Sequence, residues 1–141
     1  MPKMTHDEYL RFMVERPRTA KLATVRADGR PHVAPVWFAL DGETVIFMTG
    51  ADTVKGRNLR REPRVTICVD DEQPPFSYAV VEGEAVASRN DPDLLYWSTV
   101  IGERYMGAER AEEFGRRNAV DTELLVRVTP TRVVAERNVA D

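Results

Sequence analysis

The chain has 141 residues, of which 43% are hydrophobic and 30% are charged, and its formal net charge is -3. This length suits a single domain that buries its own core without disulfides or structural metals. The slight excess of acidic residues gives no electrostatic reason to expect a nucleic-acid partner. The single cysteine, Cys68, excludes an intramolecular disulfide and a metal site built from several cysteines.

Targeting and membrane segments are not expected either. No apolar run approaches the ~18 residues that are needed to cross a bilayer. The N-terminal sequence "MPKMTHDEYLRFMVERP" is charged throughout and lacks the apolar core of a signal peptide. We therefore expect a cytoplasmic protein without a membrane partner.

The N-terminal part of the chain predicts one helix followed by strands. Thr5 and Glu8 have the spacing of a capping box, and apolar residues at helical spacing continue until Pro17. Three strands of an antiparallel meander follow, joined by sequences typical of turns, at residues 20–26, 32–40 and 43–49. Pro35 lies within the second strand and cannot donate a ladder hydrogen bond, so it predicts an edge or bulge position.

The rest of the chain predicts more strands and a helical insert. A short basic helix begins after Asp52 or Thr53 and ends before Pro63, and Gly83 marks a bulge in a long strand. The expected elements are a helix at 54–62, strands at 64–70 and 76–88, a helical insert at about 90–119, and strands at 123–130 and 131–137. Six or seven antiparallel strands with few helices favour one mainly β domain over residues 1–141, a small closed or nearly closed barrel.

Positive charge is concentrated in one segment, "GADTVKGRNLRREPRV" at residues 50–65. The first turn of a helix here would present free N–H groups to an anion, and Lys55 and Arg57 can add direct contacts. Thr49 and Thr53 supply hydroxyls, and Gly50 permits a tight turn. This favours a phosphate site, although the spacing excludes a Walker A loop. The alternative is that the arginines only solvate a surface helix.

The preceding strand, "RPHVAPVWF", adds an aromatic platform. Pro35 interrupts regular pairing, so neighbouring backbone groups can bind the edge of a flat heterocycle, and Trp37 or Phe38 can pack near its face. The alternative is that Trp37 is a core aromatic. A platform beside an anion site indicates a phosphorylated planar cofactor.

Three motifs, "GRPHVAPVWF", "KGRNLRREPRV" and "VEGEA", resemble the pyridoxamine 5'-phosphate oxidase-like flavoproteins, and most closely their actinobacterial branch of probable F420-dependent reductases. The resemblance covers residues 18–136. It implies a split β-barrel of the FMN-binding type and a homodimer with cofactor sites at the interface. It also implies an oxidoreductase that transfers a hydride from the reduced deazaflavin to an unidentified small-molecule acceptor. The implied cofactor is coenzyme F420, with FMN as the alternative.

The resemblance also implies which residues hold the cofactor. Lys55, helped by Thr53, would bind the phosphate, and the ring would lie along residues 35–37. The implied cofactor-binding set is Pro35, Val36, Trp37, Thr49, Gly50, Thr53, Lys55, Arg57 and Asn58. The anionic tail of F420 would suit Arg60, Arg61, and Lys21 or Arg26.

No catalytic acid is evident from the sequence. His32 and Tyr78 are candidates, but a lone histidine is more often structural or exposed, and core packing is the favoured role of Tyr78. Two distant histidines with one cysteine make no metal site. The insert would either cover the pocket or pack at the dimer interface through Trp97 and Tyr105, or simply form an amphipathic lid. A third functional class stays open, a non-catalytic protein of this fold that stores a cofactor or a haem-derived ligand.

Overall fold

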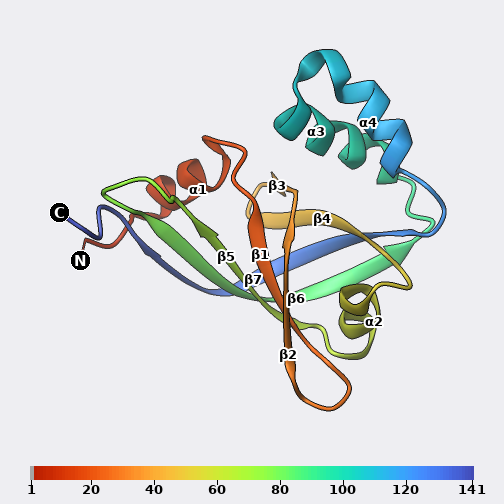
Figure 1. Ribbon diagram of the computed structural model, residues 1–141, viewed down its shortest axis with the longest axis horizontal. Coiled ribbons are helices and arrows are strands. Elements are labelled where there is room, and N and C mark those ends of the chain that lie inside the picture. The colour runs from red at the N-terminus through yellow and green to blue at the C-terminus, as the bar shows by residue number, and fades with distance from the viewer. Residues whose placement is uncertain (1) are drawn as a thin grey trace.

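A computed structural model describes residues 2–141 (Figure 1). In chain order its elements are α1 (His6–Val14), β1 (Ala20–Val25), β2 (Pro31–Val36), β3 (Phe38–Asp41), β4 (Thr44–Gly50), α2 (Val54–Arg61), β5 (Arg64–Asp70), β6 (Tyr78–Arg89), α3 (Leu94–Met106), η1 (Ala108–Arg110), α4 (Ala111–Asn118) and β7 (Glu123–Glu136). The strands form one seven-stranded antiparallel sheet in the order β2-β1-β5-β6-β7-β4-β3. The sheet is strongly curled, which confirms the expected mainly β, barrel-like fold.

The second expected strand, 32–40, is in fact two strands. The chain breaks at Trp37, so that β2 pairs with β1 at one edge of the sheet while β3 pairs with β4 at the other edge. The expected continuous meander is therefore wrong at this residue. Pro35 lies opposite Lys21 in an edge strand, as its missing N–H predicted. Because one residue connects the two edges, the sheet has to curl to bring them together.

The two expected C-terminal strands are one strand, β7. Gly83 of β6 pairs with Pro130, and the register shifts between Glu82 and Gly83, which confirms the expected bulge. A Cβ on Gly83 would lie only 2.7 Å from the Thr129 carbonyl oxygen, so the bulge requires glycine there. Thr131 donates a hydrogen bond to the Glu82 carbonyl at 3.2 Å and holds the two strands together past the proline. Pro130 is thus tolerated inside a strand because it lies at the bulge.

The core fills the inside of the curled sheet. Helix α1 has the predicted capping box, with the Glu8 N–H donating to the Thr5 hydroxyl and the Thr5 N–H donating to the Glu8 carboxylate. The helix buries three large side chains, Tyr9, Phe12 and Met13, in the main apolar cluster. The largest fully buried strand residues of this cluster are Leu22, Phe38, Phe47, Ile67 and Leu124. Burial of these side chains is the main stabilising term of the fold.

The helical insert is a pair of closely packed helices, α3 and α4. The Ser98 hydroxyl donates to the Gly115 carbonyl at 2.9 Å, and a Cβ on Gly115 would lie 2.2 Å from the Thr99 hydroxyl oxygen. The close helix contact therefore depends on glycine at this position. A second apolar cluster joins the insert to β4 and β7 through Ile46, Leu94 and Leu125, with Met48, Trp97 and Ala119 packed against them.

An ion pair holds the start of the insert on the sheet. The Arg127 guanidinium binds the Asp91 carboxylate at 2.7 Å and also reaches Asp93 at 3.4 Å. The hydrogen bond from Arg127 lowers the pKa of Asp91 to about 2. The pair therefore stays intact over the whole neutral range and fixes where α3 begins. None of the helices in residues 2–141 combines the length and apolarity needed to span a bilayer.

Candidate cofactor site

A pocket of about 240 Å³ lies where the break between β2 and β3 meets β4, α2 and the insert. Its lining residues are Pro35, Val36, Trp37, Met48, Lys55, Ile101, Asn118 and Glu123. Four of the nine predicted cofactor residues, Pro35, Val36, Trp37 and Lys55, are thus brought to one pocket from distant parts of the chain. In Figure 1, α2 and the insert lie toward the right-hand side, with β4 running between them.

The aromatic wall of the pocket is fixed by the insert. The ring of Trp37 stacks on Tyr105 of α3, with 4.9 Å between the centroids and an interplanar angle of 1°. The Tyr105 hydroxyl accepts a hydrogen bond from the Phe38 N–H at 3.2 Å and donates one to the Arg18 carbonyl at 2.7 Å. Arg104 also donates to the Phe38 carbonyl. Trp37, which belongs to neither strand ladder, is therefore oriented by side chains of α3 rather than by the sheet.

The opposite wall is the beginning of α2, which packs closely against the end of β4. A Cβ on Gly56 would lie 2.1 Å from the Gly50 carbonyl oxygen. Thr53 caps the helix: its hydroxyl accepts from the Gly56 N–H at 3.1 Å, donates to the Gly50 carbonyl at 2.8 Å and lies 3.1 Å from the Thr49 hydroxyl. Both predicted hydroxyls, Thr49 and Thr53, thus have partners within the protein, and Lys55 is the α2 side chain that lines the pocket.

The remaining predicted residues on α2 face elsewhere. The Asn58 side chain is only 4% exposed, and its amide donates to the buried Thr24 hydroxyl at 3.0 Å. Arg60 donates to the Ala51 carbonyl at 2.7 Å, and Arg61 donates to the Asn58 amide oxygen at 3.2 Å. These side chains hold α2 on β1 and on the preceding loop.

Arg57 lies in a separate basic hollow beside the β1–β2 turn. This hollow has a volume of about 430 Å³ and is lined by Arg26, Ala27, Asp28, Arg30, Val54, Arg57, Asn58 and Arg61. Arg30 is bound to Asp28 at 2.7 Å, so part of its charge is neutralised locally. Arg26, one of the residues expected for an anionic tail, lines the hollow together with Arg57. Lys21, the other candidate, is paired with Asp70 at 2.7 Å.

Glu123 was not predicted, and it is the acidic residue of the pocket. It begins β7 and pairs with Gly50, and its Oε2 atom would lie 3.4 Å from a Cβ on Gly50. Burial raises the pKa of the Glu123 carboxyl above its ordinary value, and the Lys55 ammonium partly opposes this shift. Met48, Ile101 and Asn118 were also missed. A glutamate directly before the apolar run "LLVRV" was the one sequence signal, because strand alternation turns it away from the core.

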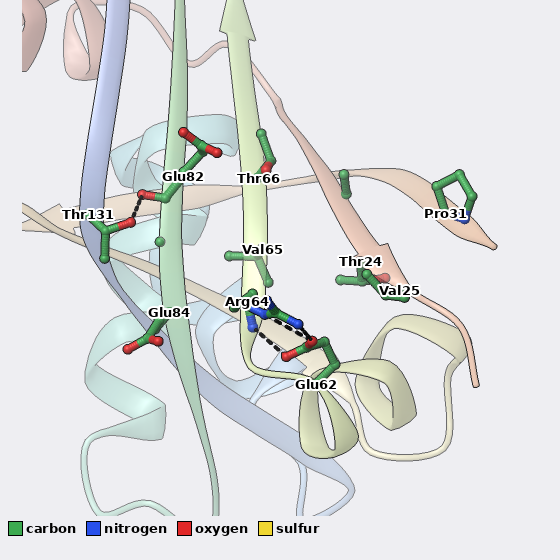
Figure 2. Close-up of a pocket in the computed structure, with 12 residues that line it drawn as sticks. Thr24, Val25, Pro31, Glu62, Arg64, Val65, Thr66, Glu82, Glu84 and Thr131 are labelled. Carbon is green, nitrogen blue, oxygen red and sulfur yellow. Dashed lines mark hydrogen bonds and ion pairs between the residues drawn. The ribbon is translucent and has the colours of Figure 1, made fainter. Parts of the chain in front are cut away.

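A larger groove on the outer face of β1, β5 and β6 contains none of the predicted site residues (Figure 2). It has a volume of about 430 Å³. Figure 2 shows Glu62 and Arg64 bound to each other at one end, Glu82 and Glu84 projecting from β6, and Val25 and Pro31 on the far side. Its charges are mixed, so it offers no concentrated binding site for an anion. In residues 2–141 no group of three His, Cys, Asp or Glu side chains is arranged to hold a metal ion.

The sequence between residues 5 and 135 matches the family model described as pyridoxamine 5'-phosphate oxidase. The chain belongs to the pyridoxamine 5'-phosphate oxidase family. The match covers nearly all of the described chain, from the cap of α1 to the end of β7, and therefore includes both walls of the pocket.

Individual relatives carry different descriptions. The structure of the conserved hypothetical protein Rv2991 from Mycobacterium tuberculosis is 27% identical, with a TM-score of 0.82, and covers 98% of this chain and 89% of its own. A structure described as an F420 reductase is 31% identical, with a TM-score of 0.72, covering 87% of this chain and 94% of its own. The heme oxygenase HutZ of Vibrio cholerae is 33% identical over 112 residues, 77% of this chain. The chain spans 60% of the length of HutZ.

Proposed function

We propose that the protein is an F420-dependent oxidoreductase that reduces a small-molecule acceptor. The observation that carries this proposal is the pocket that residues 35–37, the end of β2 and the break at Trp37, line together with Lys55. A flat ring and a phosphate need such walls, one aromatic and the other cationic. The 31% identity to a protein described as an F420 reductase supports the choice of cofactor.

The pocket residues would have separate tasks. Lys55 would bind the cofactor phosphate as a point charge, while Pro35, Val36 and Trp37 would support the edge and face of the ring. Met48 and Ile101 would keep water from the ring on the insert side. Reduced F420 supplies a hydride from its deazaflavin ring to an electron-poor acceptor when it is bound. The basic hollow with Arg26 and Arg57 lies between α2 and the β1–β2 turn and suits the anionic tail of F420.

We further propose that two copies of the chain complete the site. A pocket of about 240 Å³ is small, because sites for ligands of drug size occupy roughly 300–1,000 Å³. Val33 and Val86 are 66% and 67% exposed, which leaves apolar surface on the strands for a second subunit. Sedimentation of the purified protein should give the mass of a dimer; a monomer at micromolar concentration would contradict this part of the proposal.

A second candidate follows from the relationship to HutZ, whose description names heme. The chain would then bind or store a tetrapyrrole. Its two histidines do not line the pocket: His6 is paired with Glu43 at 2.7 Å, and His32 lies on β2 with a buried ring nitrogen that has no partner in residues 2–141. Axial ligation of heme by a histidine in this pocket is therefore not supported, and we rank F420 first, with FMN as the alternative cofactor.

Binding and turnover separate these candidates. The purified protein should be colourless, bind F420 more tightly than FMN or hemin in fluorescence titrations, and oxidise reduced F420 when enone, quinone or nitro acceptors are added. A yellow protein with a flavin spectrum, or tighter binding of FMN, would replace F420 by FMN. Tight binding of hemin with no oxidation of reduced F420 would favour the storage function instead.

A further inference from the structure

The pocket contains a carboxylate, that of Glu123, close to the place where the phosphate of the ligand is expected. Glu123 lies beside Gly50 and the cap of α2: a Cβ on Gly50 would be 3.4 Å from Glu123 Oε2 and 3.1 Å from Thr53 Cγ2. This position is at the positive end of the α2 dipole and next to Lys55. An acidic side chain there competes with any ligand phosphate for the same cation.

The charges that face Glu123 come from one neighbouring element. Lys55 of α2 is the charged group that acts on the pKa of Glu123. The paired strand β4 contributes Gly50 and Met48, and the insert contributes Asn118 and Ile101, all of which are uncharged. No ion pair within 4.0 Å joins Lys55 to Glu123 in the described residues, so neither group is held by the other. The Lys55 ammonium therefore remains able to bind a ligand, but at a site that already has one negative charge.

We infer that Glu123 is a charge-selecting residue, which favours a ligand whose phosphate is a singly charged diester over one whose phosphate is a doubly charged monoester. This inference rests on the proposed function, because it takes Lys55 as the phosphate ligand. A phosphomonoester loses its second proton near pH 6 and is close to a dianion at neutral pH. A phosphodiester has one charge over this range. A dianion is attracted about twice as strongly by Lys55, but it is also repelled about twice as strongly by Glu123, so the carboxylate cancels the advantage that the lysine alone would give it. Because a dianion also costs more to desolvate, the diester is then favoured.

The preference for the diester should depend on pH, because phosphate binding changes the protonation of Glu123. A bound phosphate raises the pKa of Glu123 further than burial alone, since the carboxylate then faces a second negative charge. Binding consequently takes up a proton wherever Glu123 is ionised in the free protein and protonated in the complex. In that window the affinity falls as the pH rises, and it falls more for the dianion.

The consequence concerns the choice of cofactor. The phosphate of F420 is a diester, whereas that of FMN is a monoester. Glu123 thus discriminates between the two through the phosphate, independently of any preference of the Trp37 wall for one ring over the other. Removing the charge should weaken this discrimination and leave the aromatic wall of the pocket at Trp37 unchanged.

A matched pair of probes tests the inference: 5-deazaflavin mononucleotide, a phosphomonoester, and its monomethyl ester. Dissociation constants are measured by fluorescence at pH 5.5, 6.5 and 7.5 for the wild type, Glu123→Gln, Lys55→Ala and Glu112→Gln. Glu112 is an exposed glutamate of α4 outside the pocket and serves as the control. Thermal melting of each variant establishes that it is folded.

In the wild type, the monoester should lose affinity relative to the methyl ester by about tenfold between pH 5.5 and 7.5. In Glu123→Gln the trend should reverse, because no carboxylate then opposes the attraction between Lys55 and the dianion. Glu112→Gln should behave as the wild type. An unchanged ratio in Glu123→Gln, with both probes weakened by Lys55→Ala, would overturn charge selection and leave the proposed function intact. If Lys55→Ala changed neither affinity, or if neither probe bound to any variant, both proposals would be wrong.

Discussion

The two sides of α2 differ in what their side chains do. Gly56 and Asn58 face the sheet: Gly56 packs closely on Gly50, and Asn58 donates a hydrogen bond to Thr24. Lys55 faces the pocket together with Glu123 and is held by no ion pair in the described residues. Both sides belong to one short basic motif, so the family motif places structural positions next to Lys55, the position that we propose as the phosphate ligand. The difference predicts that mutations on one side affect folding and mutations on the other affect binding.

The largest effect is expected for Gly56→Ala. The new Cβ would overlap the Gly50 carbonyl oxygen, and neither the strand end nor the helix can move without losing the Thr53 cap. We expect a loss of about 3 kcal/mol in the free energy of unfolding, measured by urea denaturation. Arg57→Ala, one residue along the same helix, should change it by less than about 0.5 kcal/mol. Equal stabilities for the two variants would contradict the close packing of α2 on β4.

Asn58→Ala should have the next largest effect, a loss of roughly 2.5 kcal/mol in the free energy of unfolding, because it leaves the buried Thr24 hydroxyl without its partner. A double-mutant cycle with Thr24→Val isolates the pair: the second mutation should cost less once the first is present. The affinity of the folded variant for F420 should stay within a few-fold of the wild type. A variant of full stability that no longer bound F420 would instead make Asn58 a cofactor ligand, as the sequence motif implied.

Lys55→Ala should change the affinity for F420 and leave the stability of the fold nearly unchanged, the reverse of Asn58→Ala. The loss of a charge-assisted contact with the phosphate should weaken F420 binding by about 2 kcal/mol, roughly 30-fold, with little change in the unfolding midpoint. Isothermal titration calorimetry measures the first quantity and thermal melting the second. Arg57→Ala should weaken binding much less. If Lys55→Ala unfolded the protein and left the affinity of the remaining folded fraction intact, the pocket would not be the phosphate site.

The smallest effect is expected for the stability of Glu123→Gln. Because burial holds the pKa of Glu123 above its unfolded value, the ionised carboxylate opposes folding once the pH exceeds that unfolded value. The variant should therefore be more stable than the wild type at pH 7, by less than about 1 kcal/mol, and equal to it at pH 4. Melting temperatures at the two pH values test this. A variant that is less stable at pH 7 would indicate that Glu123 forms a stabilising pair with Lys55.

Sequence patterns predicted those features that depend on neighbouring residues. The capping box of α1, the Thr53 cap, the strand at Arg64–Asp70 and the bulge at Gly83 are all confirmed, since turn and cap chemistry acts over a few residues. The curled, mainly β fold followed from the number of strands and from the family resemblance.

Features that depend on distant partners were wrong or missed. The break at Trp37 and the continuity of β7 through Pro130 are decided by which strand lies opposite. The pairing of β2 ends one residue after Pro35, whereas β7 stays paired with β6 beyond Pro130. Asn58 carries the sequence signature of a site residue, but its partner Thr24 is 34 residues away. The local pattern at Glu123 indicates only that its side chain turns away from the core; that it enters the pocket depends on the pairing of β7 with the end of β4.

The central claim is that the cofactor lies between the strand break and Lys55, and a crystal structure of the protein with F420 tests it most directly. The account predicts the phosphate within hydrogen-bonding distance of Lys55 Nζ and the deazaflavin ring against Pro35, Val36 and Trp37. A cofactor bound in the outer groove of β1, β5 and β6, or one whose phosphate lies only in the hollow of Arg26 and Arg57, would contradict it.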